Sequence, residues 1–268
     1  TGQVQTNLLG TDSFQEVDIT GMTLPITKHS YLVKDANDIP RIVKEAFHIA
    51  GTGRPGPVLI DLPKDVMTAE VTKSCPDQIC LPSYKYFSKG NAGQINEAAK
   101  AIAKSKKPVI YAGGGVITSG AGNVMQELVE KLDIPVVTTL MGIGSIPSAH
   151  TNHLGMVGMH GTITANLAVD DCDLLIAVGV RFDDRVTSGL NHRFATKAKV
   201  IHIDIDPAEI GKVVRAKIPI VGDARLVLEE LSKKVQAPEI TEWWSQLRLW
   251  QKEYPLRYEQ DGRLKPQM

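Results

Sequence analysis

The fold is indicated most clearly by residues 108–115, which read Pro108-Val109-Ile110-Tyr111-Ala112-Gly113-Gly114-Gly115. A short apolar run that ends in glycines is typical of a buried strand followed by a tight turn. Before this run, Asn91 opens a stretch in which Ile95, Ala99 and Ile102 share one helical face. We therefore expect a helix, a strand and a turn in direct succession.

The same alternation continues to about residue 236. Helices are predicted near 121–132 and 162–169 and over 224–235, and strands over 136–139, 174–178, 200–205 and 218–221. Apolar strands that alternate with helices indicate an α/β fold, a parallel sheet covered by helices on both faces. We expect this domain to occupy residues 91–236 and to bind a ligand beyond the carboxyl ends of its strands.

Upstream, residues 1–70 carry another α/β pattern. Residues 3–9 resemble a strand at its start. A helix is predicted from Asn37 or Asp38 to residue 51, and a buried strand bounded by prolines follows over 57–63.

Two further segments flank the central domain. Residues 71–90 are rich in proline, serine and lysine without periodicity, which predicts a linker. The first half of residues 237–268 carries Trp243, Leu247 and Trp250 at helical spacing, which predicts a helix that packs on a neighbouring element.

Composition excludes several classes of protein. Apolar residues make up 43% and charged residues 22%, which is ordinary for a globular protein and excludes disorder and collagen. The 30 basic and 30 acidic residues cancel, so nucleic acid lacks the electrostatic attraction that it needs. No apolar stretch approaches the ~20 residues of a membrane span. Three scattered cysteines form no disulfide framework or zinc motif, which favours a reducing compartment, the cytoplasm.

Nearly every predicted strand of the central domain ends in glycine or a small polar residue. Glycines let a backbone approach a ligand closely, and carboxylates at strand ends can accept from ribose hydroxyls, which favours a nucleotide-type cofactor. A simple turn is the competing interpretation at each glycine. The Gly-x-Gly-x-x-Gly fingerprint of an ordinary NAD site is absent from these segments.

Three other features allow a functional or a structural interpretation. Gly158-Met159-His160-Gly161-Thr162 precedes a predicted helix whose amino end could receive an anion, and His160 could equally be a core residue. Arg181-Phe182-Asp183-Asp184-Arg185 is either a binding site or a solvated loop. Lys28 could attract a carboxylate or be an ordinary surface lysine.

Together these segments resemble the large catalytic subunit of the acetohydroxyacid synthase (acetolactate synthase) family. The resemblance rests on five motifs: Gly10-Thr11-Asp12-Ser13-Phe14-Gln15-Glu16; Ile26-Thr27-Lys28-His29-Ser30-Tyr31; Gly53-Arg54-Pro55-Gly56-Pro57-Val58 with Asp61-Leu62-Pro63-Lys64-Asp65; Gly158-Met159-His160-Gly161-Thr162; and Arg181-Phe182-Asp183-Asp184-Arg185-Val186. The third motif is shared widely among thiamine diphosphate enzymes. The second and fifth are far more specific.

The resemblance implies a domain organisation. Residues 1–70 would be the second half of the amino-terminal domain that contacts the pyrimidine of thiamine diphosphate, and residues 91–236 the central FAD-binding domain. Residues 237–268 would lead towards a carboxy-terminal domain that binds the diphosphate through Mg2+. The glutamate that activates the cofactor and all metal ligands would lie outside these 268 residues, and we expect the chain alone to be inactive.

The resemblance also implies site residues. Gln15, Lys28 and Arg185 would serve catalysis, with Arg185 binding the carboxylate of the second 2-ketoacid, and the substrate channel would include Phe14, Met159 and Asp184. Many more residues would contact FAD: Arg54, Gly113, Gly114, Thr139, Leu140, Met141, His160, Gly161, Gly179, Arg181, Asp183, Asp204, Ile205, Gly222 and Asp223. In this family FAD performs no net redox step.

The implied reaction condenses pyruvate with pyruvate or 2-ketobutyrate, in the synthesis of valine and isoleucine. The implied assembly is a homodimer or homotetramer that can pair with a small regulatory subunit. Gln5 stands where the family usually has proline in the channel that binds herbicides, so ordinary herbicide sensitivity is not assumed. Another thiamine diphosphate carboligase, a pyruvate oxidase or a free-standing nucleotide-binding module are the alternatives.

Overall fold

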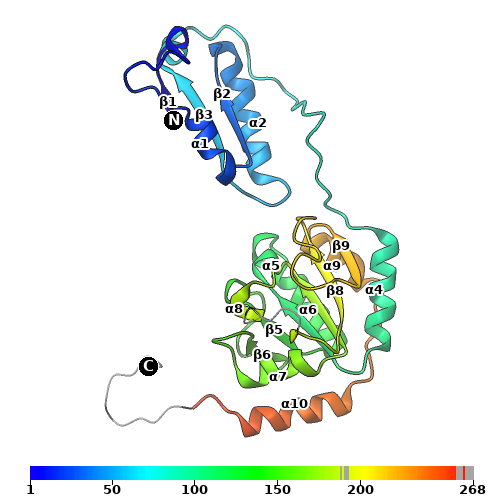
Figure 1. Cartoon of the computed structure of the whole chain (residues 1–268). Coiled ribbons are helices and arrows are strands. Elements are labelled where there is room, and N and C mark those ends of the chain that lie inside the picture. Colours follow the sequence, from blue (N-terminus) through cyan, green and yellow to red (C-terminus); the bar gives the residue numbers. More distant parts are fainter. Residues whose placement is uncertain (188, 190–192, 258–261, 263–268) are drawn as a thin grey trace. The chain divides into compact units, whose positions relative to one another are not determined.

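A computed structural model describes residues 1–187, 189, 193–257 and 262. It divides into two units, Thr1–Tyr86 and Phe87–Met268, and each is considered by itself (Figure 1). No helix in the described ranges combines the length and the apolar character that crossing a membrane requires.

The first unit contains a three-stranded parallel sheet in the order β1-β3-β2. These strands span Gly2–Gln3 (β1), His29–Leu32 (β2) and Val58–Pro63 (β3). The predicted helix is confirmed as α2 (Ile39–Gly51), and the predicted strand at 57–63 as β3. Shorter helices are η1 (Thr6–Leu8), α1 (Ile19–Thr23), η2 (Leu24–Ile26), η3 (Ala36–Asp38) and α3 (Lys64–Thr68).

The predicted strand over residues 3–9 is wrong. Only Gly2–Gln3 pairs with β3, and the chain then turns into η1. Asp65 causes the turn, because its carboxylate accepts from the Thr6 amide at 3.0 Å and from the Thr6 hydroxyl at 2.5 Å. These bonds draw residue 6 away from the line of a strand.

The predicted linker, residues 71–90, contains no helix or strand. Its first part is nevertheless bound to α2 and to η3. Lys44 donates to the Pro76 and Asp77 carbonyls at 2.7 and 2.8 Å, and the Asn37 side chain accepts from the Thr72 amide at 2.9 Å. Residues 72–77 are therefore part of the surface of the first unit.

The second unit is built on a six-stranded parallel sheet in the order β6-β5-β4-β7-β8-β9, as the alternating pattern predicts. Its strands are β4 (Pro108–Ala112), β5 (Val136–Thr138), β6 (His153–Met156), β7 (Leu174–Val178), β8 (Lys199–Asp204) and β9 (Ile218–Val221). Its helices are α4 (Ala92–Lys104), α5 (Gly114–Thr118), α6 (Gly122–Leu132), η4 (Leu140–Gly142), α7 (Ile163–Asp171), α8 (Asp184–Thr187), α9 (Ala224–Ser232) and α10 (Thr241–Glu253).

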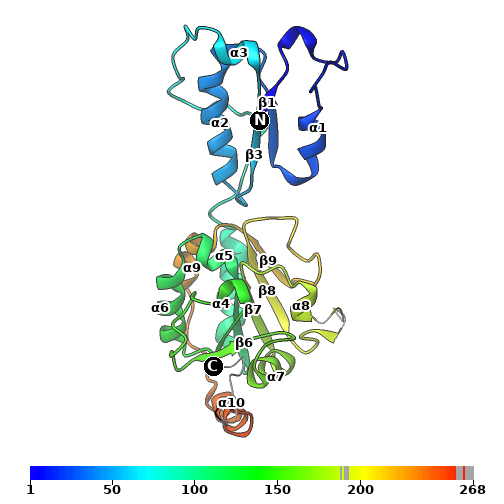
Figure 2. The same ribbon diagram turned by 90° about the vertical axis from the view of Figure 1, so that its left-hand side faces the viewer.

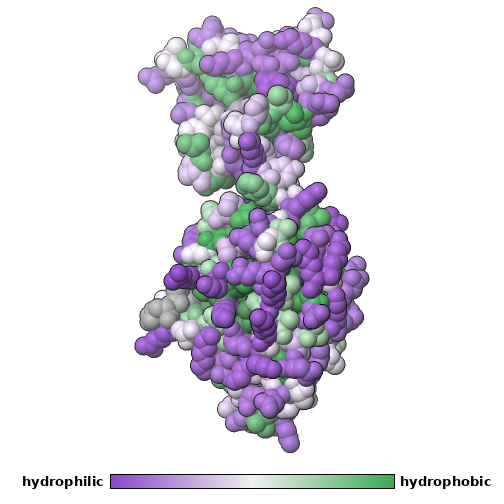
Figure 3. All heavy atoms as spheres, turned by 90° about the vertical axis from the view of Figure 1, so that its right-hand side faces the viewer, coloured by the Kyte–Doolittle hydropathy of each residue, from purple (hydrophilic) through white to green (hydrophobic). Residues whose placement is uncertain are grey.

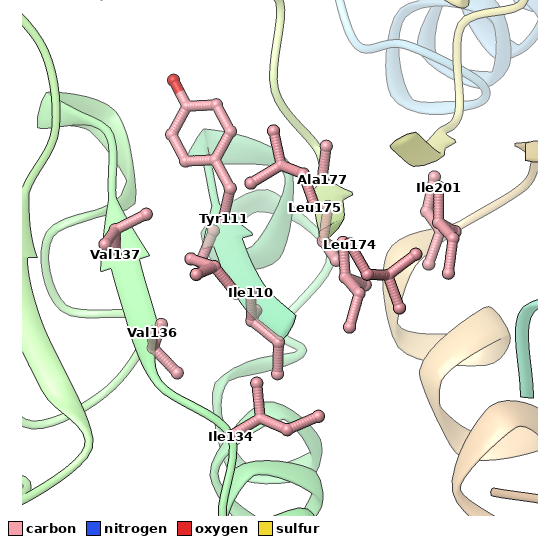
Figure 4. Close-up of a cluster of buried hydrophobic side chains, with 14 of the residues drawn as sticks. Ile110, Tyr111, Ile134, Val136, Val137, Leu174, Leu175, Ala177 and Ile201 are labelled. Atoms are coloured by element: carbon pink, nitrogen blue, oxygen red, sulfur yellow. The ribbon is translucent and has the colours of Figure 1, made fainter. Parts of the chain in front are cut away.

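Helices cover both faces of this sheet. Helices α6 and α9 lie on one face with α4, and α7 lies on the other, as Figure 2 shows. All five residues of β4 and of β7 are buried, which is why these strands read as continuous apolar runs instead of alternating ones. Figure 4 shows part of the resulting core, where Ile110 and Tyr111 pack among residues of β5 and β7. Hydrophilic residues predominate on the outer face that carries α4 (Figure 3).

The tryptophan-rich helix is confirmed as α10. Trp243 is buried and its indole N–H donates to the Pro108 carbonyl at 3.2 Å, while the Trp250 ring meets it edge-on at 5.7 Å. Beyond α10, residues 258–261 and 263–268 of the predicted 237–268 segment lie outside the described residues.

Candidate functional site

The order of the strands defines where a ligand can bind. From β4 the chain moves outward through β5 and β6, then crosses to β7 and moves outward on the other side through β8 and β9. The connections that follow β4 and β7 therefore lead to opposite sides of the sheet, and in doubly wound folds dinucleotides bind at such a reversal. This strand order is also the one that the Rossmann fold uses.

The structure brings most predicted cofactor residues to this edge. Because all six strands are parallel, their carboxyl ends meet at one edge of the sheet. The predicted FAD contacts of the second unit all stand at or shortly after those ends, in six loops: Gly113 and Gly114; Thr139, Leu140 and Met141; His160 and Gly161; Gly179, Arg181 and Asp183; Asp204 and Ile205; Gly222 and Asp223. Their contact with FAD stays a prediction.

The loops at the reversal pack backbone against backbone. Gly179 has φ +59, and a Cβ there would stand 2.5 Å from the Gly115 Cα and 2.9 Å from its nitrogen. A Cβ on Gly113 would overlap the Gly179 carbonyl in turn. The Gly115 amide donates to the Gly179 carbonyl at 3.1 Å. Glycine is therefore required at these positions by the packing of the protein itself, whether or not a ligand binds.

Gly113, Gly114, Gly115 and Gly179 together form a surface without side chains, here called the glycine floor. The surface beside it is apolar and accessible. Leu140 and Met141 are 69% and 71% exposed. Met141 approaches Gly114 so closely that a Cβ on the glycine would stand 3.1 Å from the Met141 Cβ. A floor without side chains, bordered by accessible apolar ones, suits a flat ring system such as a flavin.

The polar residues at the edge mostly hold the loops. The Asp223 carboxylate caps α9 by accepting from the Leu226 amide at 3.1 Å, and Asp204 accepts from the Asp206 amide at 2.9 Å. Thr139 accepts from the Gly142 amide at 2.9 Å. The Asp223 carboxylate and the Thr139 hydroxyl can each accept further hydrogen bonds.

The amino end of α7, predicted to receive an anion, is capped from within. Thr162 accepts from the Ala165 amide at 3.0 Å, and the Asn166 side chain accepts from the Gly158 amide at 2.9 Å. His160 is exposed, so the core interpretation of this histidine is wrong.

Residues 181–185, the charged loop, contact residues 158–162, the α7 loop. The Met159 amide donates to the Arg185 carbonyl at 2.9 Å, and a Cβ on Gly158 would stand 2.7 Å from the same oxygen. A predicted channel residue, Met159, and a predicted catalytic residue, Arg185, are thus joined through their backbones. Arg181 and Asp183 form an exposed ion pair at 3.9 Å, and the side chains of Asp184 and Arg185 are exposed.

Phe182, in the middle of this loop, was not predicted as a site residue. It is 2% exposed and has φ +52, a left-handed conformation that costs a residue with a side chain ~1–3 kcal/mol. The available signal was a single aromatic residue among four charges, since an exposed loop seldom needs one.

In the first unit, Phe14 and Gln15 lie on an exposed loop that Glu16 closes. Its carboxylate accepts from the Gly10 amide, from the Thr11 amide at 3.2 Å and from the Ser13 amide at 3.1 Å. The bond from Gly10 is the largest cause that lowers the pKa of Glu16. Gln15 has φ +68, and the Phe14 ring is 91% exposed.

Lys28 is neither a free surface lysine nor an available cation in this unit. Its ammonium donates to the Ile49 carbonyl, to the Thr52 carbonyl at 2.6 Å and to the Tyr84 hydroxyl at 3.2 Å. Those carbonyls close the carboxyl end of α2, where a cation is favoured. Arg54 follows in the exposed turn between α2 and β3.

No group of three or more His, Cys, Asp or Glu side chains among the described residues could hold a metal ion. Cys75 and Cys80 are exposed and Cys172 is buried, all as free thiols.

Comparisons with known proteins identify relatives of the chain. Residues 95–231 match the family described as "Thiamine pyrophosphate enzyme, central domain". The chain is 52% identical over 270 residues to the acetolactate synthase large subunit of Corynebacterium glutamicum, covering 98% of this chain and 43% of the relative. It is 56% identical over 243 residues to a probable acetolactate synthase large subunit of Methanocaldococcus jannaschii, covering 90% and 41%.

A third relative is the acetolactate synthase isozyme 3 large subunit of Escherichia coli, 46% identical over 276 residues. That match covers 99% of this chain and 48% of the relative. The chain therefore spans somewhat less than half the length of these relatives.

Proposed function

The chain belongs to the thiamine pyrophosphate enzymes, and we propose that it forms part of the catalytic large subunit of an acetolactate synthase. The proposed reaction joins pyruvate, with loss of CO2, to a second pyruvate or to 2-ketobutyrate, as a step towards valine and isoleucine. When bound, thiamine diphosphate supplies the electron sink for this chemistry. The observation that carries the proposal is the bond between the Met159 amide and the Arg185 carbonyl, which joins two predicted substrate loops at the ligand edge of the sheet.

We assign Arg185 to the carboxylate of the acceptor 2-ketoacid. A guanidinium presents two parallel N–H donors, which match the two oxygens of a carboxylate better than an ammonium does. Its exposed side chain leaves these donors accessible. Met159 and Asp184 would line the channel beside it, and the proposed roles of Phe14 and Gln15 rest on the family resemblance alone. Lys28 enters the proposal with its ammonium already bonded to the end of α2, so it would reach a substrate only by releasing those acceptors.

We assign FAD to the edge formed by the glycine floor. The floor and the exposed Leu140 and Met141 fit a flavin ring, and the Asp223 carboxylate after β9 would provide an acceptor for hydroxyl groups. The role of FAD would be structural. The glutamate that activates thiamine diphosphate and the ligands of Mg2+ would lie outside the described residues.

For the complete protein we further propose a homodimer or homotetramer in the cytoplasm that can pair with a small regulatory subunit, without nucleic-acid or membrane partners. The balanced charge supports the absence of nucleic acid. The chain alone should make no acetolactate from pyruvate in the presence of thiamine diphosphate, Mg2+ and FAD.

Replacement of Arg185 in the complete enzyme tests the assigned site. Arg185→Ala should reduce condensation with 2-ketobutyrate by about 100-fold while CO2 release from pyruvate changes only slightly, because losing a charge-assisted pair costs ~2–3 kcal/mol. Arg215→Ala, at an exposed arginine before β9, is the matched control. Equal losses of CO2 release and condensation in Arg185→Ala would contradict the assignment.

Flavin content tests the cofactor edge without reference to activity. Gly114→Val in the complete enzyme should lower the FAD that remains bound on purification, because the new side chain fills the floor beside Met141. Gly122→Val, at the first residue of α6, is the control, since a Cβ at Gly122 would meet nothing closer than the Ser145 carbonyl oxygen at 3.6 Å. Full flavin content in Gly114→Val would argue against this edge as the site.

A further inference from the structure

Phe182 is the one residue of the charged loop that is directed into the core. The residues on either side of it, Arg181 and Asp183, are exposed, whereas Phe182 is 2% exposed. Phe182 has φ +52 and follows Gly179, which has φ +59, by three residues. A non-glycine residue persists in this conformation only when its surroundings hold it there. The contacts of the ring therefore determine the path of the loop.

Three aromatic rings hold Phe182. The His202 ring meets it edge-on with centroids 5.1 Å apart, Phe194 does so at 5.8 Å, and Tyr111 packs at a tilt at 5.7 Å. Edge-to-face contacts at these separations are the favoured geometry for aromatic pairs. His202 is itself oriented by a 3.0 Å bond between its Nε2 and the Val180 carbonyl. The ring cluster thus links the loop to strands β4 and β8.

From Phe182 the constraint passes to Arg185 through the backbone. The Asp183 carbonyl accepts from the Val186 and Thr187 amides at 3.1 and 3.0 Å, which forms the single turn of α8. The Arg185 carbonyl accepts from the Met159 amide at 2.9 Å. Arg185 is therefore held between the α7 loop and a helical turn whose starting point is set by Phe182.

We propose that Phe182 is a positioning residue for Arg185: the buried ring fixes the backbone from which the guanidinium meets the carboxylate of the acceptor 2-ketoacid. This inference rests on the proposed function and adds a specificity determinant to it. Phe182 touches no substrate. It acts on the capture of the acceptor and leaves decarboxylation of the first pyruvate unaffected.

Three replacements in the complete enzyme separate the ring from the backbone conformation. Phe182→Ala removes the ring and keeps the strained conformation, Phe182→Gly removes both, and Phe182→Leu keeps a buried side chain of similar size. We expect the alanine and glycine variants to raise the KM for 2-ketobutyrate about tenfold and to lower the yield of acetohydroxy acid per CO2 released. Phe182→Leu should keep most of the wild-type yield. If the alanine variant does not fold, the comparison of Phe182→Leu with Phe182→Gly still tests the role of the buried side chain.

A matched control is Leu128→Ala on α6, which leaves a comparable cavity in the same core on a helix away from the loop. It should lower stability without changing the yield per CO2. Amide hydrogen exchange in the chain itself supplies a second readout: exchange at Met159 should accelerate in Phe182→Ala and stay protected in Leu128→Ala.

The outcomes distinguish the two claims. A wild-type enzyme that forms no acetohydroxy acid would overturn the proposed function and this inference with it. An active wild type in which Phe182→Ala and Leu128→Ala change the yield equally, or in which exchange at Met159 is unchanged, would overturn the inference alone.

Discussion

Replacing Gly179 by alanine tests the packing at the strand reversal. The left-handed φ of +59 costs a residue with a Cβ ~1–2 kcal/mol. The new Cβ would also stand 2.5 to 3.0 Å from three backbone atoms of Gly115, so the two loops must separate. Overpacking of this kind costs ~1–3 kcal/mol, for a total of about 2–5 kcal/mol. This is a large share of the ~5–15 kcal/mol that stabilises a typical domain.

Urea unfolding followed by tryptophan fluorescence measures this loss. All three tryptophans lie on α10, so their signal reports on the second unit alone. We expect the unfolding midpoint of Gly179→Ala to fall by ~1–2 M urea.

Gly120→Ala is the control for strain alone, because Gly120 has φ +66 and open space around its Cβ position. It should lose only ~1–2 kcal/mol. If the two alanine variants lose the same free energy of unfolding, the backbone contact between the loops has no energetic weight and the reasoning is refuted.

Three further predictions concern other residues. Burial lowers the pKa of His202 below 6.5, so the unfolded chain binds more protons than the folded chain near that pH. The free energy of unfolding should therefore fall as the pH drops below about 6.5. Urea titrations at several pH values should show a weaker fall in His202→Gln than in the wild type. Lys28→Met should speed amide hydrogen exchange at the carboxyl end of α2, whereas Lys34→Met, at an exposed lysine, should not. Unchanged exchange in Lys28→Met would favour a Lys28 that only binds substrate. Glu16→Gln should make the loop that carries Phe14 more susceptible to proteolysis, because the carboxylate that binds the loop amides is lost. Acidification of the wild type below pH 4.5 should have the same effect. Equal cleavage rates in Glu16→Gln and the wild type at neutral pH would contradict the role of the carboxylate.

Strands β4, β5 and β7 could be predicted because burial on both faces favours apolar residues at successive positions, whereas the only partly buried β6 was not predicted. β4 and β7 are the clearest cases. Strand β2, with His29 and Ser30 at its start, carries too little apolar character to be recognised. The turn at residue 6 depends on Asp65, which is 59 residues away, so local pattern could not reveal it.

The loops that form the candidate site could be predicted from the sequence, but their positions relative to one another in the second unit could not. Strand ends identified the ligand edge, but the order of the strands is a property of long-range pairing that local periodicity does not contain. The contact between Met159 and Arg185 follows from that order together with the positive φ of Phe182. Likewise, Lys28 appeared as a candidate substrate ligand because its acceptors are backbone carbonyls, which leave no trace in residue type.

The central claim is that this chain belongs to an enzyme that makes 2-acetohydroxy acids. The most direct measurement incubates the complete polypeptide that contains it with pyruvate and 2-ketobutyrate in the presence of thiamine diphosphate, Mg2+ and FAD, and identifies the products by mass. Acetolactate and acetohydroxybutyrate, formed only when thiamine diphosphate is present, are the predicted products. Release of CO2 without either condensation product, or no turnover of pyruvate at all, would contradict the claim.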